Sequence, residues 1–408
     1  MGNAMIHALN AGNLDRLAEL VEQYAFTIMD VNEASSFLQW LSALPDHITS
    51  SYPWLSIAKA WLLIYLGRTD GVEQIIREVE KHADNANPRL LGYIAAIRTL
   101  IGEYIYIQSD VTDAINDAHR AFELLPPNEF RPRAFVSYHL ANILSWIGNT
   151  SEAFKALEDA SSLSLSAGDL EMAMTAQFEL AAILRGQGKL RESLRMYEKT
   201  LLMLGSDDPN RKLKSLPVGY SYLQKALIYL EWNDLEKALH LAREGLRICK
   251  LWGYSDFLYN GWYFYSSILY ETGDLDQALN AIYEAKGVFT GVSPIDRIHA
   301  LEAVIRLAKG DLTSADNWIK DSGLSSEDIP DFAHRVEYYH FARILTAEGK
   351  LEEAYQILER LLVCAEEAGA TSFSLYILIQ QAIINQDQGN GEKALSLLQR
   401  ALGLAEPE

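Results

Sequence analysis

Small and apolar residues recur along most of the chain with the spacing of amphipathic helices, and one thirteen-residue pattern returns seven times. Each copy begins with Ala or Ser, has Ile two positions later, Gly or Asn seven positions later, and Ala or Ser twelve positions later. Two weaker copies precede them at 60–72 and 102–114, and a degenerate one lies around Gly12. The seven strict copies occupy residues 141–153, 181–193, 226–238, 266–278, 303–315, 342–354 and 382–394.

Each copy predicts two antiparallel helices joined by a tight turn. The Gly or Asn at the turn ends the first helix because it adopts the left-handed conformation easily, and an Asp, Asn or Thr after it caps the second helix. The small residues on either side let the two helix backbones approach closely, while the Ile fills the space between pairs. The turns lie at positions 67, 109, 148, 188, 233, 273, 310, 349 and 389, about 40 residues apart. The pattern therefore predicts an all-α solenoid.

The same pattern suggests how the chain is organised. Residues 1–85 keep a helical character but lose the strict repeat, so we expect an N-terminal helical cap there and one continuous solenoid over 86–408. The widest step between turns, from Gly188 to Asn233, contains the segment 206–217, which we expect to form a surface loop. No linker rich in Pro, Gly or Ser divides the chain.

Composition and charge narrow the function. Apolar residues make up 49% of the chain, and 35 Lys and Arg stand against 55 Asp and Glu, a formal charge of −20. Such an acidic chain is unsuited to gripping nucleic acid or an anionic membrane directly. It has no apolar run of about 20 residues and no basic, then apolar, N-terminus. Its two cysteines, Cys249 and Cys364, fit small core positions of a reduced, cytoplasmic protein.

The chemistry of an enzyme is missing from the sequence. There is no GxxxxGK[ST] run, and the nearest lookalike, GQGKL at 186–190, belongs to a repeat turn. There is no HExxH, and His334 and His340 are six positions apart, which places them on different sides of a helix. Adjacent glutamates such as Glu352 and Glu353 are typical of a solvated helix face. We therefore predict a binding protein without catalytic residues, metal or cofactor.

The repeat length points to a family. Helix pairs of about 40 residues, longer than the 34 of tetratricopeptide repeats (TPR), resemble the sensor domain of MalT-like ATP-dependent transcriptional activators of the LuxR class. The segment FLQWLSALPD at 37–46, followed by YPWL at 52–55, is similar to the start of that domain. The opening HALNAGNLDRLAELVE at 7–22 and the closing RALGLAEPE at 400–408 resemble the family's flanking stretches.

The resemblance implies a right-handed, TPR-like superhelix that senses an inducer for a bacterial regulator. The family carries an N-terminal nucleotide-binding module and a C-terminal helix-turn-helix, and this chain matches only the middle piece, so we expect it to be an excised sensor segment. The expected partner is a small-molecule inducer, and the segment itself should not contact DNA. Assembly in this family resembles a task of the nucleotide-binding module, so the segment should be a monomer or weak dimer.

In such a superhelix the first helix of each pair lines the concave groove. With the small residue of each copy as zero and about 100° per residue, offsets −6, −3, +1, +4 and +5 form one stripe on the first helices. It mixes aromatic rings with polar groups, as a polar ligand with some apolar surface requires. The predicted groove residues are Tyr138, Asn142, Phe178, Arg185, Tyr220, Asn260, Tyr263, Tyr270, Arg297, Tyr339 and Arg343. The same offsets also select Trp146, Thr175, Glu271, Tyr376 and Gln386. We call these residues the stripe.

Other interpretations remain open. Arg185 and Arg343 also fit simple pairing with acidic neighbours, and Trp252, Trp262 and Phe264 fit the core. The alternative function is a scaffold or adaptor that binds a peptide or protein partner along the groove. Such a protein needs a ladder of Asn on successive first helices, and the stripe offers Asn142 and Asn260 only. This favours a compact ligand.

We expect the isolated chain neither to retard promoter DNA at physiological salt nor to hydrolyse ATP, because it is acidic and lacks a phosphate-binding loop. Gel retardation and a phosphate-release assay check this. A shifted promoter fragment or measurable turnover would contradict the sequence interpretation.

Overall fold

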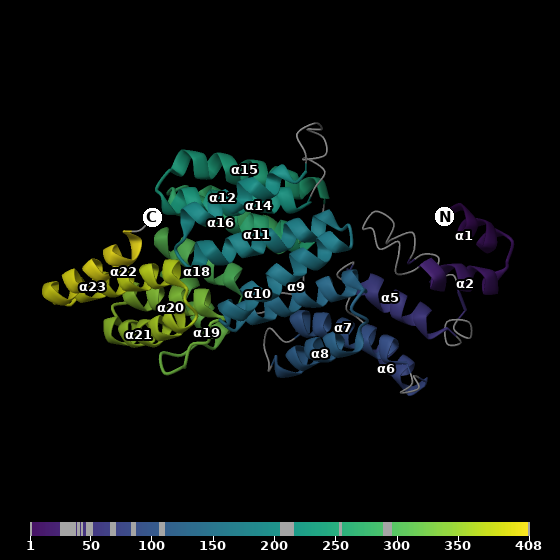
Figure 1. Ribbon diagram of the computed structural model, residues 1–408. Coiled ribbons are helices and arrows are strands. Elements are labelled where there is room, and N and C mark those ends of the chain that lie inside the picture. Colours follow the sequence, from purple (N-terminus) through teal and green to yellow (C-terminus); the bar gives the residue numbers. More distant parts are fainter. Residues whose placement is uncertain are drawn as a thin grey trace. The chain divides into compact units, whose positions relative to one another are not determined.

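The computed structural model describes residues 2–24, 38, 41, 44–45, 52–65, 71–82, 87–105, 111–204, 216–252, 255–288 and 296–406. Every regular element in these ranges is an α-helix, and consecutive helices form antiparallel pairs (Figure 1). The first helices of the pairs are α1 (Gly2–Asn10), α5 (Pro53–Tyr65), α7 (Pro88–Ile105), α9 (Phe130–Trp146), α11 (Leu170–Gly186), α14 (Leu216–Glu231), α16 (Ser255–Glu271), α18 (Arg297–Ala308), α20 (Arg335–Ala347) and α22 (Thr371–Asp387). The second helices are α2 (Leu14–Tyr24), α6 (Val72–His82), α8 (Thr112–Leu124), α10 (Thr150–Ser166), α12 (Leu190–Leu202), α15 (Leu235–Trp252), α17 (Leu275–Val288), α19 (Leu312–Ser322), α21 (Leu351–Glu367) and α23 (Gly391–Ala405). The all-α prediction is confirmed.

The predicted turns end the first helices as expected. All seven turn residues of the strict copies have a positive φ, between 59° at Asn233 and 87° at Gly310. Several second helices are also preceded by the predicted capping residue. Asp234, Asp274 and Asp311 each accept a hydrogen bond from the backbone N–H three residues later. The predicted turns at 67 and 109 and most of the 206–217 loop lie outside the described residues, although Leu216 and Pro217 belong to α14.

The small residues of the repeat hold each pair together. In α11–α12 the buried hydroxyl of Ser193 donates to the carbonyl oxygen of Ala181 at 2.6 Å. In α16–α17 the bond runs the other way, from Ser266 to the carbonyl of Ala278 at 2.9 Å. Both pairs join the first and last positions of a copy, so these positions lie directly opposite each other. Only side chains this small allow a hydroxyl to reach the backbone of the neighbouring helix.

Helices α14 and α15 approach each other over two glycines. A Cβ built on Gly245 would lie 2.8 Å from the carbonyl oxygen of Gly219 and 2.8 Å from Cγ of Leu223. A Cβ on Gly219 would lie 2.9 Å from Sγ of Cys249, which is buried as predicted. Backbone atoms therefore occupy the space that side chains would need.

By the density of its contacts the chain divides into two compact units. Unit 1 comprises residues 1–143 and 162–169, and unit 2 comprises 144–161 and 170–408. In unit 1 the guanidinium of Arg98 on α7 bridges Glu73 and Glu80 of α6 at 3.1 and 2.7 Å. The boundary at residue 85 between a cap and a continuous solenoid stays a prediction.

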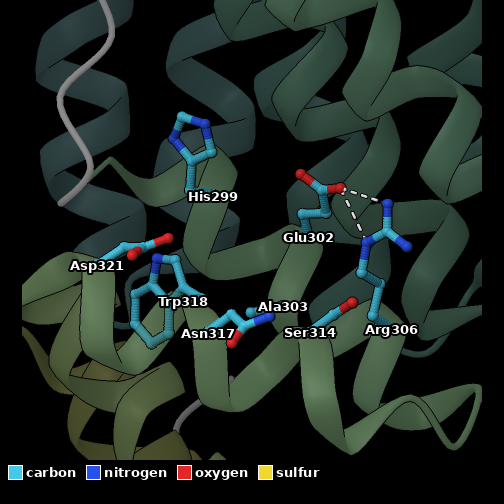
Figure 2. A pocket seen from close by; sticks show the side chains of 8 residues that line it. All are labelled: His299, Glu302, Ala303, Arg306, Ser314, Asn317, Trp318 and Asp321. Atoms are coloured by element: carbon cyan, nitrogen blue, oxygen red, sulfur yellow. Dashed lines mark hydrogen bonds and ion pairs between the residues drawn. The ribbon is translucent and has the colours of Figure 1, made fainter.

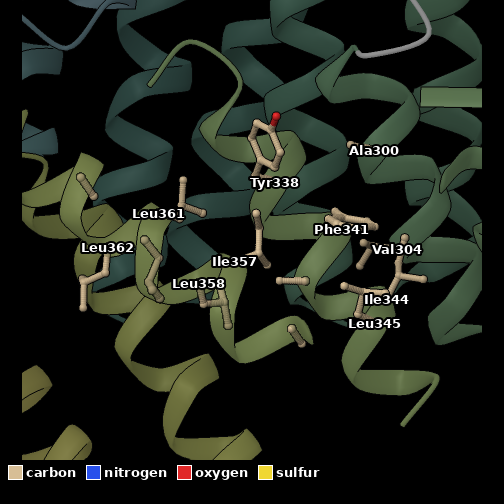
Figure 3. Packing of buried hydrophobic residues seen from close by; sticks show 14 of the residues in the cluster. Ala300, Val304, Tyr338, Phe341, Ile344, Leu345, Ile357, Leu358, Leu361 and Leu362 are labelled. Atoms are coloured by element: carbon tan, nitrogen blue, oxygen red, sulfur yellow. The ribbon is translucent and has the colours of Figure 1, made fainter. Parts of the chain in front are cut away.

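The core of unit 2 runs between successive helix pairs. Its C-terminal cluster packs Phe341, Ile344 and Leu345 of α20 against Val304 of α18 and Ile357 of α21 (Figure 3). The Ile of each strict copy is fully buried, except Ile183, which is half-buried. Among the described helices none is long and apolar enough to cross a membrane.

Replacing Gly245 by Ala should destabilise the fold by about 1–3 kcal/mol, because the new methyl group meets the backbone of α14. The matched control is Gly403→Ala in α23, where a Cβ meets nothing within 4 Å; there the better helix propensity of Ala should leave stability equal or raised by up to about 1 kcal/mol. Urea unfolding of both variants measures the difference. Equal urea midpoints for the two variants would show that α14 and α15 do not approach each other closely at Gly245.

Candidate ligand-binding stripe

Most of the stripe lies on six first helices of unit 2, α11, α14, α16, α18, α20 and α22. Several of its side chains contact a stripe residue of another first helix. Arg297, the first residue of α18, donates a hydrogen bond to the amide oxygen of Asn260 on α16. Its guanidinium carbon also lies 4.6 Å from the ring centroid of Tyr263. One turn of α16 and the start of α18 thus form a polar and aromatic cluster, in which the ring quadrupole stabilises the cation.

A second cluster continues the stripe towards the C-terminus. Arg343 of α20 donates to the hydroxyl of Tyr270 on α16. Its guanidinium carbon lies 5.3 Å from the Tyr270 ring and 5.9 Å from the Tyr339 ring. The ring of Tyr339 in turn lies 6.4 Å from that of Tyr376 on α22. The stripe is therefore continuous over α16, α20 and α22.

Helix α22 contacts α11 and α14, which lie much earlier in the sequence of unit 2. Arg185 at the end of α11 pairs with Glu231 at the end of α14 at 2.7 Å. The hydroxyl of Ser372 lies 2.8 Å from the carbonyl oxygen of Arg185 and 3.1 Å from Oε2 of Glu231. Nearby, the hydroxyl of Thr150 donates to the carbonyl of Ala368 at 2.8 Å. These five residues, which we call the closing contact, join positions up to 218 apart in sequence.

The tyrosine side chains of the stripe are partly desolvated, although some of their surface remains accessible to solvent. Burial raises the pKa of Tyr220, of Tyr263 and of Tyr376, yet Tyr376 exposes 42% of its surface. At neutral pH these hydroxyls are uncharged and both donate and accept hydrogen bonds.

Two charged residues of α20 join the stripe near Tyr263. Burial lowers the pKa of Arg335, while the charge of Glu337 raises it and the charge of Arg297 lowers it. Glu337 is only 6% exposed, and burial raises its pKa to about 7 against the opposing effect of the His334 and Arg297 charges. Both residues influence the pKa of the Tyr263 hydroxyl as well. Helices α16, α18 and α20 thus bring several charged groups to one place.

A cavity of about 700 Å³ lies elsewhere, between α18 and α19 (Figure 2). Glu302 on its wall is held by Arg306 and Lys286. The indole nitrogen of Trp318 is buried, and no hydrogen-bond partner for it lies among the described residues. The wall comprises His299, Glu302, Ala303, Arg306, Ser314, Asn317, Trp318 and Asp321. On α18 these residues lie on the side opposite the stripe, so the cavity is separate from the predicted site.

The MalT-like TPR region is a family whose model matches residues 92–408 of the chain. The chain belongs to this family. It is 20% identical over 405 residues to the HTH-type transcriptional regulators MalT of Vibrio campbellii and Vibrio parahaemolyticus, covering 98% of this chain and 44% of each regulator. The chain therefore spans less than half the length of these relatives. The resemblance predicted from the repeat and its flanking segments is confirmed.

Two solved structures share the fold of this chain. A Rap protein complexed with Competence and Sporulation Factor matches with a TM-score of 0.62 and 14% identity, over 88% of this chain and 98% of that one. The apo form of the quorum sensor NprR from B. thuringiensis matches with a TM-score of 0.53 and 12% identity, over 98% of this chain and 99% of that one. At such low identity the likeness concerns the fold alone.

Three of the predicted groove residues of this MalT-like chain take no part in these contacts of unit 2. The predicted groove position of Phe178 is wrong. Phe178 is fully buried, and its ring centroid lies 5.6 Å from that of Tyr197 on α12, inside the helix pair. Tyr138 and Asn142 belong to unit 1, where the Asn142 amide donates to Glu103 at 2.9 Å. The place of Tyr138 and Asn142 in a groove therefore stays a prediction.

The alternative interpretation of Arg185 and Arg343 was pairing with acidic neighbours. Arg185 does pair with one, Glu231, whereas Arg343 contacts tyrosines. Trp262 is buried as predicted and Phe264 is half-buried, while the side chain of Trp252 lies outside the described residues.

Several residues at the stripe were not predicted, although the pattern held a signal for some of them. Glu231 lies five positions after Ala226, the same offset that selects Glu271, and Ser372 lies on the same angular stripe one turn further out. Arg335 falls one position before the first offset used. Glu337 lies on another side of α20, and only the packing of three helices brings it to Tyr263.

Glu337→Gln should make the folded protein more stable at pH 8 but not at pH 4. The carboxyl stays protonated in the folded state up to about pH 7, whereas in the unfolded chain it ionises near 4.5. The folded state thus holds the extra proton between these values, and wild-type stability falls as the pH rises through that window. The variant should gain up to about 3 kcal/mol above it.

Unfolding free energies from pH 4 to 8 test this, with Glu359→Gln on the exposed face of α21 as the control. A variant that follows the wild-type curve at every pH would mean that Glu337 is not desolvated.

Proposed function

We propose that this chain is the inducer-sensing, signal-transducing segment of a MalT-type transcriptional regulator and binds a small molecule in a concave groove lined by the stripe of unit 2. Membership of the MalT-like family and relatives named as transcriptional regulators support a regulatory role. The observation that carries the proposal is the cluster of Asn260, Tyr263 and Arg297. It offers a ring face, an amide and a forked donor from two neighbouring helices.

Binding there can be coupled to a change of curvature. In a solenoid each pair contacts mainly its neighbours, so small rotations between pairs add up along the chain. A ligand that bridges α16, α18 and α20 stabilises one spacing of these helices. It thereby shifts the population towards the curvature that it fits. The change in curvature would form or break the closing contact, in which α22 touches α11 and α14.

In the full-length protein the signal would pass to the modules that this segment lacks. We propose that the liganded segment favours the ATP-bound, multimeric, DNA-binding state through a nucleotide-binding module and a helix-turn-helix. The segment itself contributes no catalytic group, remains a monomer or weak dimer on its own, and works in the cytoplasm.

The alternative, an adaptor for a peptide or protein, needs free amides on successive first helices. The stripe carries two Asn side chains, Asn142 on α9 and Asn260 on α16, and these are not successive first helices. A compact ligand therefore fits the stripe better than an extended chain.

Tyr263→Ala should weaken binding of a small-molecule ligand at least tenfold, about 1.4 kcal/mol, because it removes the ring that faces Arg297. The unliganded variant should still fold with a moderately lower melting temperature, since Tyr263 is half-buried and packs at the edge of a core cluster. The ligand is found by thermal-shift screening of sugars, phenols and aromatic acids, and its affinity is then measured by calorimetry.

The control for this experiment is Tyr283→Ala on α17, whose side chain is 48% exposed and bonded to Arg306 on the cavity side of α18. It should leave affinity unchanged. The proposal is wrong if no small molecule binds and a peptide does, or if binding depends on Trp318 of the α18–α19 cavity and not on Tyr263.

A further inference from the structure

The last of the described helices, α23, is apolar over a wider arc than one neighbouring helix covers. At about 100° per residue its Leu and Ala side chains occupy about half of the helix circumference. On one side of this arc Leu397 and Ala401 pack into the C-terminal core cluster. On the other side Leu395, Leu398 and Leu402 are 62%, 39% and 69% exposed. We call these three leucines the end face.

The middle position of the end face belongs to the core in the earlier helix pairs. Leu398 follows Ala382, the first residue of its copy of the repeat, by sixteen positions. At the same position five earlier second helices carry a fully buried residue, and Ile319 of α19 is half-buried. The five buried residues are Leu157, Tyr197, Ala242, Ile282 and Leu358. Leu398 is thus the exposed copy of a core position.

In earlier pairs the first helix of the next pair covers these positions. Leu246 occupies on α15 the position that Leu402 occupies on α23. A Cβ built on Gly261 of α16 would lie 3.4 Å from Cδ1 of Leu246, so α16 packs directly on this leucine. Likewise Leu358 of α21 belongs to the same core cluster as Ile377 of α22. The end face therefore has the chemistry and the position of a surface that receives another first helix.

The covering helix has to come from outside the described chain. A pair that stays at the end of a solenoid needs a polar outer surface, and the end face is apolar. Helix α23 ends at Ala405, and residues 406–408 are too few for a further helical turn. The two Vibrio MalT regulators are longer than this chain, which spans 44% of each. In the earlier pairs, moreover, the covering helix is the one that follows next in the sequence.

We propose that the end face is a docking surface for one further amphipathic helix, which follows α23 in a longer protein and packs on it as a first helix packs on the preceding pair. This helix needs an apolar face of its own, because the side chains of three leucines offer no hydrogen-bonding groups. Since each pair of a solenoid contacts its neighbours, the docked helix would join unit 2 rigidly to the part of the protein that follows. The proposal does not depend on any ligand at the stripe.

Cysteine labelling measures whether the end face is covered. Leu398→Cys is introduced together with Cys364→Ser, so that the remaining native thiol is the buried Cys249. The rate of reaction with a maleimide is then compared between the 408-residue chain and the longer protein that includes the residues after Glu408. We expect labelling at position 398 to be at least about tenfold slower in the longer protein, because the thiol reacts only when the docked helix opens.

Further variants make the comparison specific. Leu251→Cys on α15, which is 64% exposed and lies outside the end face, is the matched control and should react equally fast in both proteins. Adding Leu402→Glu to Leu398→Cys should restore rapid labelling in the longer protein, since a charge buried under the docked helix is costly. If Leu398→Cys does not fold, Leu395→Cys on the same face takes its place with the same expected result.

Equal labelling rates of Leu398→Cys in the two proteins would overturn the docking surface, and so would a reading frame that stops at residue 408. Protection that is already present in the 408-residue chain and grows with protein concentration would assign the end face to a second copy of the chain instead. Slow labelling that Leu402→Glu does not relieve would also overturn the proposal, because the protection would then not come from an apolar contact at the end face.

Discussion

The close approach of two small residues inside each helix pair is the constraint on which the rest of unit 2 depends. The hydroxyl bonds from Ser193 to the carbonyl of Ala181 and from Ser266 to that of Ala278 are possible only when the helix backbones nearly touch. This contact fixes the rotation of each first helix about its axis. It therefore decides which positions of the first helix face the second helix and which belong to the stripe. The ligand-binding proposal follows from the same geometry.

Local features were predictable because each needs only a few neighbouring residues. The seven turns, several caps, the buried small residues and the family could be read from one repeat. On the stripe, the contacts of Asn260, Tyr263 and Arg297, and those of Tyr270, Tyr339 and Arg343, also join residues selected by angle alone. Phe178 was misplaced by the same rule, because an angle on a single ideal helix ignores how deeply the ring of a partner such as Tyr197 reaches between the helices.

The closing contact could not be predicted, because it depends on the sum of many small rotations. Ser372 lies 187 residues from Arg185, and four complete helix pairs lie between α11–α12 and α22. An error of a few degrees per pair would separate them, and no sequence pattern records the angle. The same limit applies to Arg335 and Glu337, whose approach to Tyr263 requires the relative placement of α16, α18 and α20. The division of the chain into two units is likewise a property of packing and not of any linker.

Half-buried arginines in unit 2 have two kinds of partner. Arg185 is neutralised by Glu231 and shares it with Ser372, so its charge is used to join helices distant in sequence. Arg297, Arg335 and Arg343 face amide, carbonyl, hydroxyl and ring groups, which stabilise a cation without neutralising it. Arg360 of α21 is held in the same way, since it donates to the carbonyl of Ser326 and forms no ion pair among the described residues. What distinguishes the stripe is therefore the aromatic rings beside its arginines, because rings and polar groups on neighbouring first helices are the combination that the proposed groove offers to a polar ligand.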